Sequence, residues 1–179
     1  MTQSQPDHHT LFKDDFAWQR KWIPRMKTII GPHLLRESSF EEDTKEATDL
    51  IVLRADGVRI ACRIRRPGYV NFNDITITCR RESGSLCEWD KMILDECADW
   101  FFYGHTTVEN PRDEGADIIP RFLINLAITR TWMKQNHGPE RGPNRGYIGQ
   151  RCWFYAFDIQ KLKAAIPHSI LGERQRIRG

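Results

Sequence analysis

TDLIVLRADGVRIACRIRRPGYVNFNDITITCR, residues 48–80, is the stretch that decides the fold. Within it, the apolar run Leu50 to Leu53 is typical of a strand buried on both faces, so we expect it at the centre of a sheet. The Asp56-Gly57 pair that follows is a strong hairpin signal. Residues 59–66 and 74–80 alternate apolar and polar side chains, as strands with one buried face do. The three segments together predict an antiparallel meander.

Helices are predicted on both sides of this meander. Apolar residues at helical spacing predict a helix over residues 10–30, kinked or split at Pro24. Ser85 and Glu88 fit a capping box that opens a second helix. The buried stripe of that second helix is expected to consist of Leu86, Trp89, Ile93 and Cys97.

The rest of the chain continues the alternation of strands and helices. Strands are predicted at 100–103, 118–124 and 152–157, and Asn125 and Asp158 are placed to cap the helices that follow the last two. The element order α-β-β-β-α-β-β-α-β-α predicts an α/β fold of the mixed α+β kind. Its central mixed β-sheet contains an antiparallel meander and is flanked by helices.

Length and composition favour one soluble domain. The chain has 179 residues, of which 40% are apolar and 28% charged, which excludes global disorder, collagen and coiled coil. We expect a disordered tail at residues 1–9, a single domain over 10–171 and a basic tail at 172–179. Neither a membrane span nor a signal peptide is visible, so we expect a cytoplasmic protein without a membrane partner.

The cysteines argue against a zinc site. A zinc site needs paired ligands at short spacing, and no two cysteines here form a CxxC pair. We expect all five to be reduced thiols of a cytosolic protein. They are Cys62, Cys79, Cys87, Cys97 and Cys152.

The charges are unevenly distributed although the net charge is only +3. Residues 59–66 contain four arginines and no acid, and residues 130–151 contain five basic residues and one acid. Clustered arginine is the electrostatic pattern of proteins that bind phosphate backbones, so DNA is the expected partner, although a solvated face gives the same pattern. The predicted nucleic-acid-binding residues are Arg59, Arg65, Arg66, Arg141, Arg145 and Arg151.

The order of a helix, a three-strand meander, a helix and a strand over residues 10–126 resembles the PD-(D/E)xK nuclease superfamily. Residues 48–52 resemble its first core strand and residues 59–66 its second. Residues 88–91 and 102–104 are also similar to small uncharacterised phage-type proteins. The resemblance to the superfamily implies a restriction-endonuclease-like core and Mg²⁺-dependent hydrolysis of DNA. In that chemistry two acidic residues bind the metal and a lysine orients the attacking water.

The second strand departs from the superfamily pattern. Asp49 matches the first acid, but Ala61-Cys62-Arg63 stands where acid-x-Lys is expected, and arginine cannot act as a base. One hypothesis places the missing acid and lysine on the following helix, as Glu88 and Lys91. The predicted catalytic residues are then Asp49, Glu88, Lys91 and Arg63, and the predicted Mg²⁺ ligands are Asp49, Glu88 and Glu46.

Three hypotheses on function remain open. The first is a metal-dependent deoxyribonuclease, and the second is a nuclease-like protein that binds nucleic acid without catalysis. The third is a protein-binding module, such as a phage-type protein acting on a host partner. Its acidic patches, residues 41–49 and 88–99 with five acids and one lysine each, would meet a basic surface. A purely structural explanation also exists, because the capping box accounts for Glu88, and helical pairing with Glu88 and Asp95 accounts for Lys91.

Overall fold

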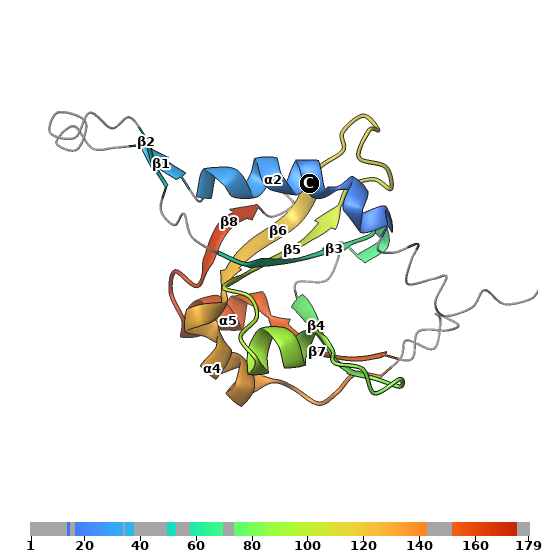
Figure 1. The fold of residues 1–179 in the computed structure, drawn as a ribbon, viewed down its shortest axis with the longest axis vertical. Helices are drawn as coiled ribbons and strands as arrows, with labels where there is room; N and C mark the ends of the chain where they lie inside the picture. Colours follow the sequence, from blue (N-terminus) through green and yellow to red (C-terminus); the bar gives the residue numbers. More distant parts are fainter. Residues whose placement is uncertain are drawn as a thin grey trace, which may run out of the picture.

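The computed structural model describes residues 14, 17–33, 35–37, 50–52, 58–69, 74–142 and 152–174. In this part of the chain the strands form one four-stranded sheet, in the order β3-β5-β6-β8, and two separate strand pairs, β1-β2 and β4-β7 (Figure 1). The strands of the larger sheet are β3 (Ile60–Arg65), β5 (Trp100–Thr106), β6 (Ile118–Asn125) and β8 (Ile170–Arg174). The two pairs consist of β1 (Leu35–Glu37), β2 (Leu50–Val52), β4 (Asp74–Arg81) and β7 (Cys152–Asp158).

The larger sheet is mixed, which confirms the predicted fold class. β3 runs parallel to β5, with Cys62 opposite Phe102. β5 and β6 are antiparallel neighbours, with Tyr103 opposite Phe122, and β8 extends the antiparallel part on the far side of β6. Helices flank the sheet, so the protein is a mixed α+β protein with a partly antiparallel central sheet.

The predicted meander is wrong in its strand pairing. β2 pairs only with β1 among the described strands, β3 pairs with β5, and β4 pairs with β7. The run at Leu50 therefore belongs to a small two-stranded sheet and is not the central strand. Alternation identifies a strand and its faces but not its partner, and this explains the error. A restriction-endonuclease-like core is not confirmed, and the predicted turn at Asp56-Gly57 lies outside the described residues.

The helical elements were predicted more accurately. Residues 17–21 are helical, Trp22 lies in a turn, and α2 (Ile23–Ile30) follows with Pro24 in its first turn, where no amide hydrogen is needed. The predicted helix is thus split, but the interruption lies at Trp22, two residues before Pro24. The remaining helical elements are the short η1 (Gly31–His33) and η2 (Pro67–Tyr69), the π-helix η3 (Asp90–Leu94), α4 (Leu126–Asn136) and α5 (Ile159–Ala165). No helix in the described ranges is long and apolar enough to cross a membrane.

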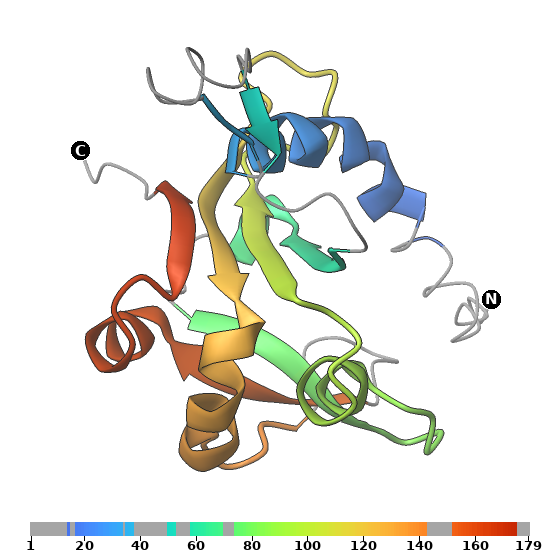
Figure 2. The same ribbon diagram turned by 60° about the vertical axis from the view of Figure 1, so that its left-hand side comes forward.

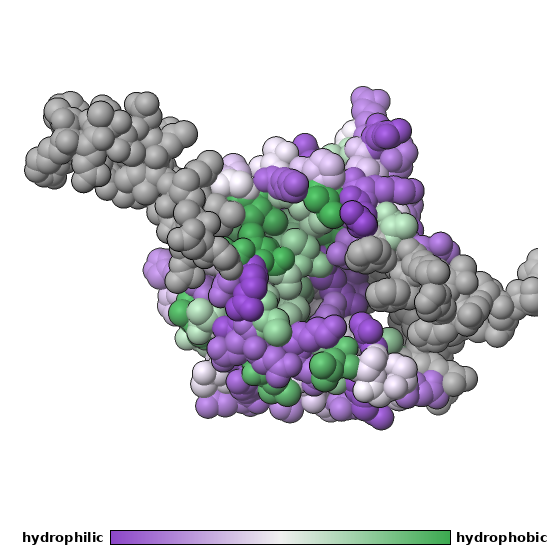
Figure 3. All heavy atoms as spheres, viewed as in Figure 1, coloured by the Kyte–Doolittle hydropathy of each residue, from purple (hydrophilic) through white to green (hydrophobic). Residues whose placement is uncertain are grey.

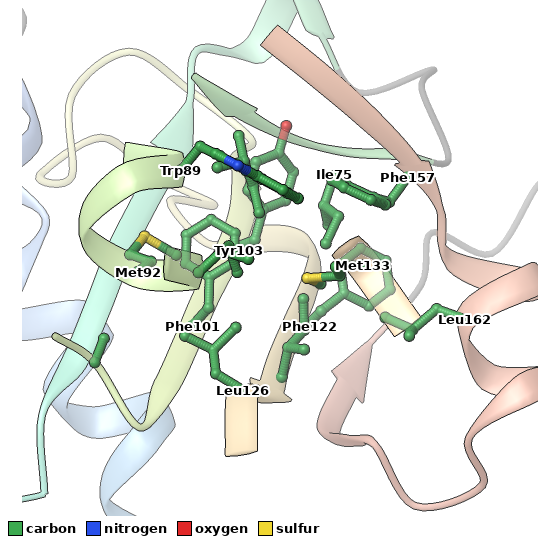
Figure 4. Packing of buried hydrophobic residues seen from close by; sticks show 14 of the residues in the cluster. Ile75, Trp89, Met92, Phe101, Tyr103, Phe122, Leu126, Met133, Phe157 and Leu162 are labelled. Atoms are coloured by element: carbon green, nitrogen blue, oxygen red, sulfur yellow. The ribbon is translucent and has the colours of Figure 1, made fainter. Parts of the chain in front are cut away.

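Both faces of the larger sheet are covered. On one face α2 packs through Trp22 and Met26 against a cluster that contains Ile64 and Phe102 (Figure 2). On the other face lies a larger core, between this sheet, the β4-β7 pair and the helices η3, α4 and α5. Residues of this core labelled in Figure 4 include Ile75, Trp89, Met92, Phe101, Tyr103, Phe122, Leu126, Met133, Phe157 and Leu162.

Side-chain caps and a buried arginine hold the helices on this core. The side chain of Asn125 accepts a hydrogen bond from the Ala127 N–H at 3.0 Å, and Asp158 accepts one from the Lys161 N–H at 3.0 Å, so both predicted caps are confirmed. Arg130 of α4 is buried and donates from Nε to the carbonyl oxygen of Met92 at 3.0 Å. This bond fixes η3 against α4.

Two features at the ends of elements differ from the prediction. The predicted basic tail includes the last three residues of β8, positions 172–174. These are a glycine and two charged residues, so only Ile170 and Leu171 give this strand an apolar signal. In the predicted second helix, Trp89 and Ile93 are buried as expected, but Leu86 is 59% exposed and Cys97 is also exposed. Leu86 precedes the first helical residue, Glu88, and Cys97 follows the end of η3 at Leu94, so neither belongs to the buried stripe of a helix.

Gly104 generates a prediction about packing within the sheet. A Cβ at this position would overlap the Cγ2 of Ile118 and lie 3.2 Å from the Pro120 carbonyl oxygen. We expect Gly104→Ala to lower the free energy of unfolding by about 2 kcal/mol, because the β5-β6 pair would have to move apart. The control is Gly68→Ala, whose Cβ would have no heavy atom within 4 Å. Equal stability of the two variants in urea denaturation would contradict this account.

Candidate functional site

The polar face of β3 is where sequence reasoning and structure agree best. Ile60, Cys62 and Ile64 contact the cluster beneath α2, whereas Arg63 and Arg65 extend from the opposite face. The predicted apolar and arginine-rich faces are therefore confirmed. In the parallel register Arg63 lies opposite Tyr103, and Arg65 lies opposite His105.

Arg63 forms the first part of a polar cluster between β3 and β4. Its Nη1 forms an ion pair with Glu88 Oε2 and donates to Thr78 Oγ1 at 3.0 Å. The same Glu88 oxygen accepts the Thr78 N–H at 2.9 Å. The two charged side chains are 21% and 29% exposed, and burial lowers the pKa of Arg63 while the Glu88 charge opposes that shift. One carboxylate thus connects β3, β4 and the segment that leads into η3.

Arg65 forms the second part of the cluster. It donates from Nη2 to Thr76 Oγ1 and from Nε to the Tyr103 hydroxyl at 3.3 Å. Thr76 and Tyr103 are also 3.3 Å apart through their hydroxyl oxygens. We call Arg63, Arg65, Thr76, Thr78, Glu88 and Tyr103 the β3–β4 polar cluster.

His105 lies at the end of this cluster. Its ring centroid is 5.5 Å from that of Tyr103, it is only 1% exposed, and neither ring nitrogen has a hydrogen-bond partner among the described residues. Burial, with a smaller contribution from the Arg65 charge, lowers the pKa of His105 from 6.5 to about 4. The imidazole is therefore neutral at pH 7.

The capping box predicted for Ser85 and Glu88 is wrong. Ser85 Oγ lies 2.9 Å from Ser83 Oγ, and Glu88 is engaged with Arg63. Asp90 performs the capping instead, since its Oδ2 accepts the Cys87 N–H at 2.8 Å and the Cys87 thiol at 2.9 Å. These two hydrogen bonds lower the pKa of Asp90.

The predicted catalytic and metal-binding residues are only partly brought together. Arg63 and Glu88 are in direct contact, but Lys91 is exposed and its side chain forms no hydrogen bond or ion pair within the described ranges. Asp49 and Glu46 lie outside the described residues. The described residues contain no group of three or more His, Cys, Asp or Glu side chains suited to a metal ion.

Glu88 therefore does not fit a magnesium site in this arrangement. Its Oε2 already accepts two hydrogen bonds, one of them from a guanidinium, and a cation next to Arg63 would meet a like charge. Mg²⁺ binding stays a prediction that rests on Asp49 and Glu46.

The predicted nucleic-acid-binding arginines occupy two kinds of environment. Arg65 is held inside the polar cluster, whereas Arg59, Arg66 and Arg141 form ion pairs near the surface, and Arg145 and Arg151 lie outside the described residues. The acidic partners of the three surface arginines are Asp99, Glu109 and Asp74, respectively.

Sequence reasoning missed Arg80, a second surface arginine that, like Arg66, stacks on a tryptophan ring. The Arg66 guanidinium lies 4.6 Å from the ring centroid of Trp18, and that of Arg80 lies 3.8 Å from the ring centroid of Trp153. Arg80 also pairs with Glu140 at 3.0 Å. Strand alternation identified Arg80 only as a polar-face residue, because its aromatic partner is 73 positions away in the chain.

A cleft of about 410 Å³ lies where β4, β7, α4 and α5 meet. Asp74 and Asp158 are opposite one another across the β4-β7 pair, and both line the cleft together with Trp132, Arg141 and Lys161. Burial raises the pKa of Asp74, and the Arg141 charge opposes that shift. The sequence marked Asp158 only as a helix cap, so this cleft was not predicted.

Comparisons with known proteins leave the site to be judged on its geometry. The chain matches no protein-family model, no curated protein and no solved structure. The resemblance to PD-(D/E)xK nucleases consequently stays a prediction. The features available for assigning a function are the β3–β4 polar cluster, the stacked surface arginines and the cleft.

Replacing Glu88 tests the structural role of the polar cluster. Glu88→Gln keeps the shape of the side chain but removes the charge that faces Arg63. We expect a loss of about 2 kcal/mol in the free energy of unfolding, since breaking a fully buried pair costs roughly 3–5 kcal/mol and this pair retains some exposure. The control is Glu140→Gln, in the more exposed pair with Arg80, which should cost less than about 1 kcal/mol. Similar losses in the two variants would refute the role given to Glu88.

His105 makes a second prediction, on the pH dependence of stability. The unfolded chain has the ordinary histidine pKa of about 6.5, so it binds a proton more readily than the folded protein, whose His105 pKa is about 4. The free energy of unfolding should therefore fall as the pH drops through this interval, by about 3 kcal/mol in total from this group. His105→Gln should remove this contribution, as measured by urea denaturation at several pH values. His137→Gln, at an exposed position, should keep the wild-type profile; if it flattens the profile as much as His105→Gln does, the assignment is wrong.

Proposed function

We propose that this protein binds nucleic acid through surface arginines that contact phosphates without reading the base sequence. The observation that carries the proposal is the pair Arg66 and Arg80, each with its guanidinium over a tryptophan ring and beside a carboxylate. A planar guanidinium matches the geometry of a phosphate and remains charged at any physiological pH. Stacking holds the group in place before a ligand arrives, which reduces the entropy lost on binding.

The acidic partners do not prevent this role. Ion pairs at the surface contribute roughly 0–1 kcal/mol, so a phosphate can replace Glu109 or Glu140 at little cost. Arg59 and Arg141 are 58% and 63% exposed at their side chains and can add to the same binding. In the view of Figure 3 hydrophilic residues predominate on the right-hand side, near the end of β3, and hydrophobic residues gather below α2.

We infer a scaffold role for Arg63 and Arg65, because both are engaged by β4 and Arg63 is also engaged by Glu88. Since Glu88 and Lys91 do not converge, the described residues favour binding over hydrolysis. Mg²⁺-dependent hydrolysis remains the second hypothesis, and its test depends on Asp49.

Titration with labelled DNA tests the binding proposal. Fluorescence anisotropy with single- and double-stranded oligonucleotides of unrelated sequence should show affinity that falls steeply as salt rises. Arg66→Gln and Arg80→Gln should each weaken binding to all sequences and reduce the slope of log K against log salt by about 1. The control is Arg25→Gln, because Arg25 also forms an ion pair, with Asp117 at 3.1 Å, but stacks on no aromatic ring of the described residues.

Two results would count against nucleic-acid binding: no affinity at low salt, or affinity that does not depend on salt. Equal effects of all three substitutions would instead refute the role given to the stacked arginines. Incubation of the same DNA with Mg²⁺ or with EDTA examines hydrolysis separately. Cleavage that needs Mg²⁺ and is lost in Asp49→Ala would support the nuclease hypothesis over binding alone. A protein-binding module would show neither DNA binding nor cleavage.

A further inference from the structure

The cleft between the β4-β7 pair and the helices α4 and α5 has no role in the function proposed above. Its volume of about 410 Å³ falls within the range of roughly 300–1,000 Å³ that is typical of small-molecule sites. Figure 2 shows the β4-β7 pair with α4 and α5 beside it in the lower half of the molecule. The lining combines two carboxylates, two cationic groups, an amide and an indole, a mixture that fits a ligand with several kinds of group.

The two carboxylates are arranged unfavourably for the protein alone. Asp74 and Asp158 face each other across antiparallel strands, where like charges destabilise a sheet. The ion pair of Arg141 with Asp74 offsets part of this repulsion, but at 3.8 Å it is beyond hydrogen-bond distance, so the Asp74 oxygens can still accept hydrogen bonds from a ligand. Asp158 uses Oδ1 to cap α5, so its second oxygen stays outside that cap. Ionised carboxylates only accept hydrogen bonds, so this part of the cleft suits a ligand that presents donors.

The other walls suit the remaining parts of a nucleotide. Trp132 is half-buried against Phe157, with ring centroids 6.3 Å apart, and it lines the cleft. An indole of this kind can stack on a base. Lys161 and Arg141 line the same cleft and can each bind a phosphate oxygen.

We propose that this cleft binds one guanine nucleotide, as a base of the nucleic acid strand that the surface arginines hold. Guanine alone among the common bases presents two adjacent donors, N1–H and the 2-amino group, on its pairing edge. Adenine and cytosine present an acceptor beside their donor, and uracil has a single donor between two acceptors, so a carboxylate repels part of each edge. The Asp74 and Asp158 carboxylates bind the guanine donors, Trp132 stacks on the ring, and Lys161 with Arg141 binds the phosphate. This assignment rests on the proposed nucleic-acid binding.

Calorimetric titration of the full chain with free mononucleotides tests the proposal. GMP should bind, IMP, which lacks the 2-amino group, should bind at least tenfold more weakly, and AMP and UMP should bind more weakly still. Asp74→Asn and Asp158→Asn should each weaken GMP binding by tenfold or more, and the asparagine at 158 still caps α5. Lys161→Gln should weaken GMP but leave guanosine, which has no phosphate, unchanged. The control is Asp95→Asn, at an exposed position after η3, with an unchanged affinity and melting temperature.

Several outcomes would overturn the assignment. These are no binding of GMP, equal binding of the four mononucleotides, or GMP binding that is unaffected in Asp74→Asn while that variant melts like the wild type. Heat from Mg²⁺ alone that disappears in Asp74→Asn, without any GMP binding, would identify the carboxylates as a metal site instead. Oligonucleotide binding measured in parallel separates the two proposals. If oligonucleotides bind and GMP does not, only the cleft assignment fails; if GMP binds and oligonucleotides do not, the cleft holds a free nucleotide and the proposed function fails.

Discussion

The contact of Arg63 with Glu88 joins the two halves of the molecule. Arg63 belongs to the four-stranded sheet, and the Glu88 oxygen that binds it also accepts the backbone N–H of Thr78 on β4. Two charges taken from water lose solvation, and only close pairing with additional hydrogen bonds offsets that loss. The Glu88 carboxylate therefore helps to set the position of the β4-β7 pair relative to the larger sheet.

This directional contact complements the apolar core. Burial of Trp89, Phe101 and Phe157 favours association of the layers, but the hydrophobic effect is non-directional and does not select one orientation. The hydrogen bonds from Arg63 and Arg65 to Thr78 and Thr76 fix the position of β4 along the length of β3. In this position Asp74, the first residue of β4, lies beside α4 and α5, where the cleft forms.

Local patterns in the sequence predicted elements well and partners poorly. Alternation located β3 and β4, an aromatic run located β7, and the caps at Asn125 and Asp158 were identified correctly, because these depend on nearby residues. Pairing of β3 with β5, across 34 intervening residues, depends on the whole chain. The candidate site shows the same limit: Arg63 and Glu88 were selected separately, but the sequence offered no reason to join them, and Asp74 had no visible link to Asp158.

The hydrogen bond between Cys87 and Asp90 has a consequence for thiol chemistry. Burial and this bond raise the pKa of Cys87, and burial raises those of Cys62 and Cys79 to about 11. Since the thiolate is the nucleophile, these three cysteines react slowly with alkylating reagents while the fold is intact. Cys87 becomes reactive only when the start of η3 opens, so its rate of alkylation reports how often this segment unfolds locally in the native protein.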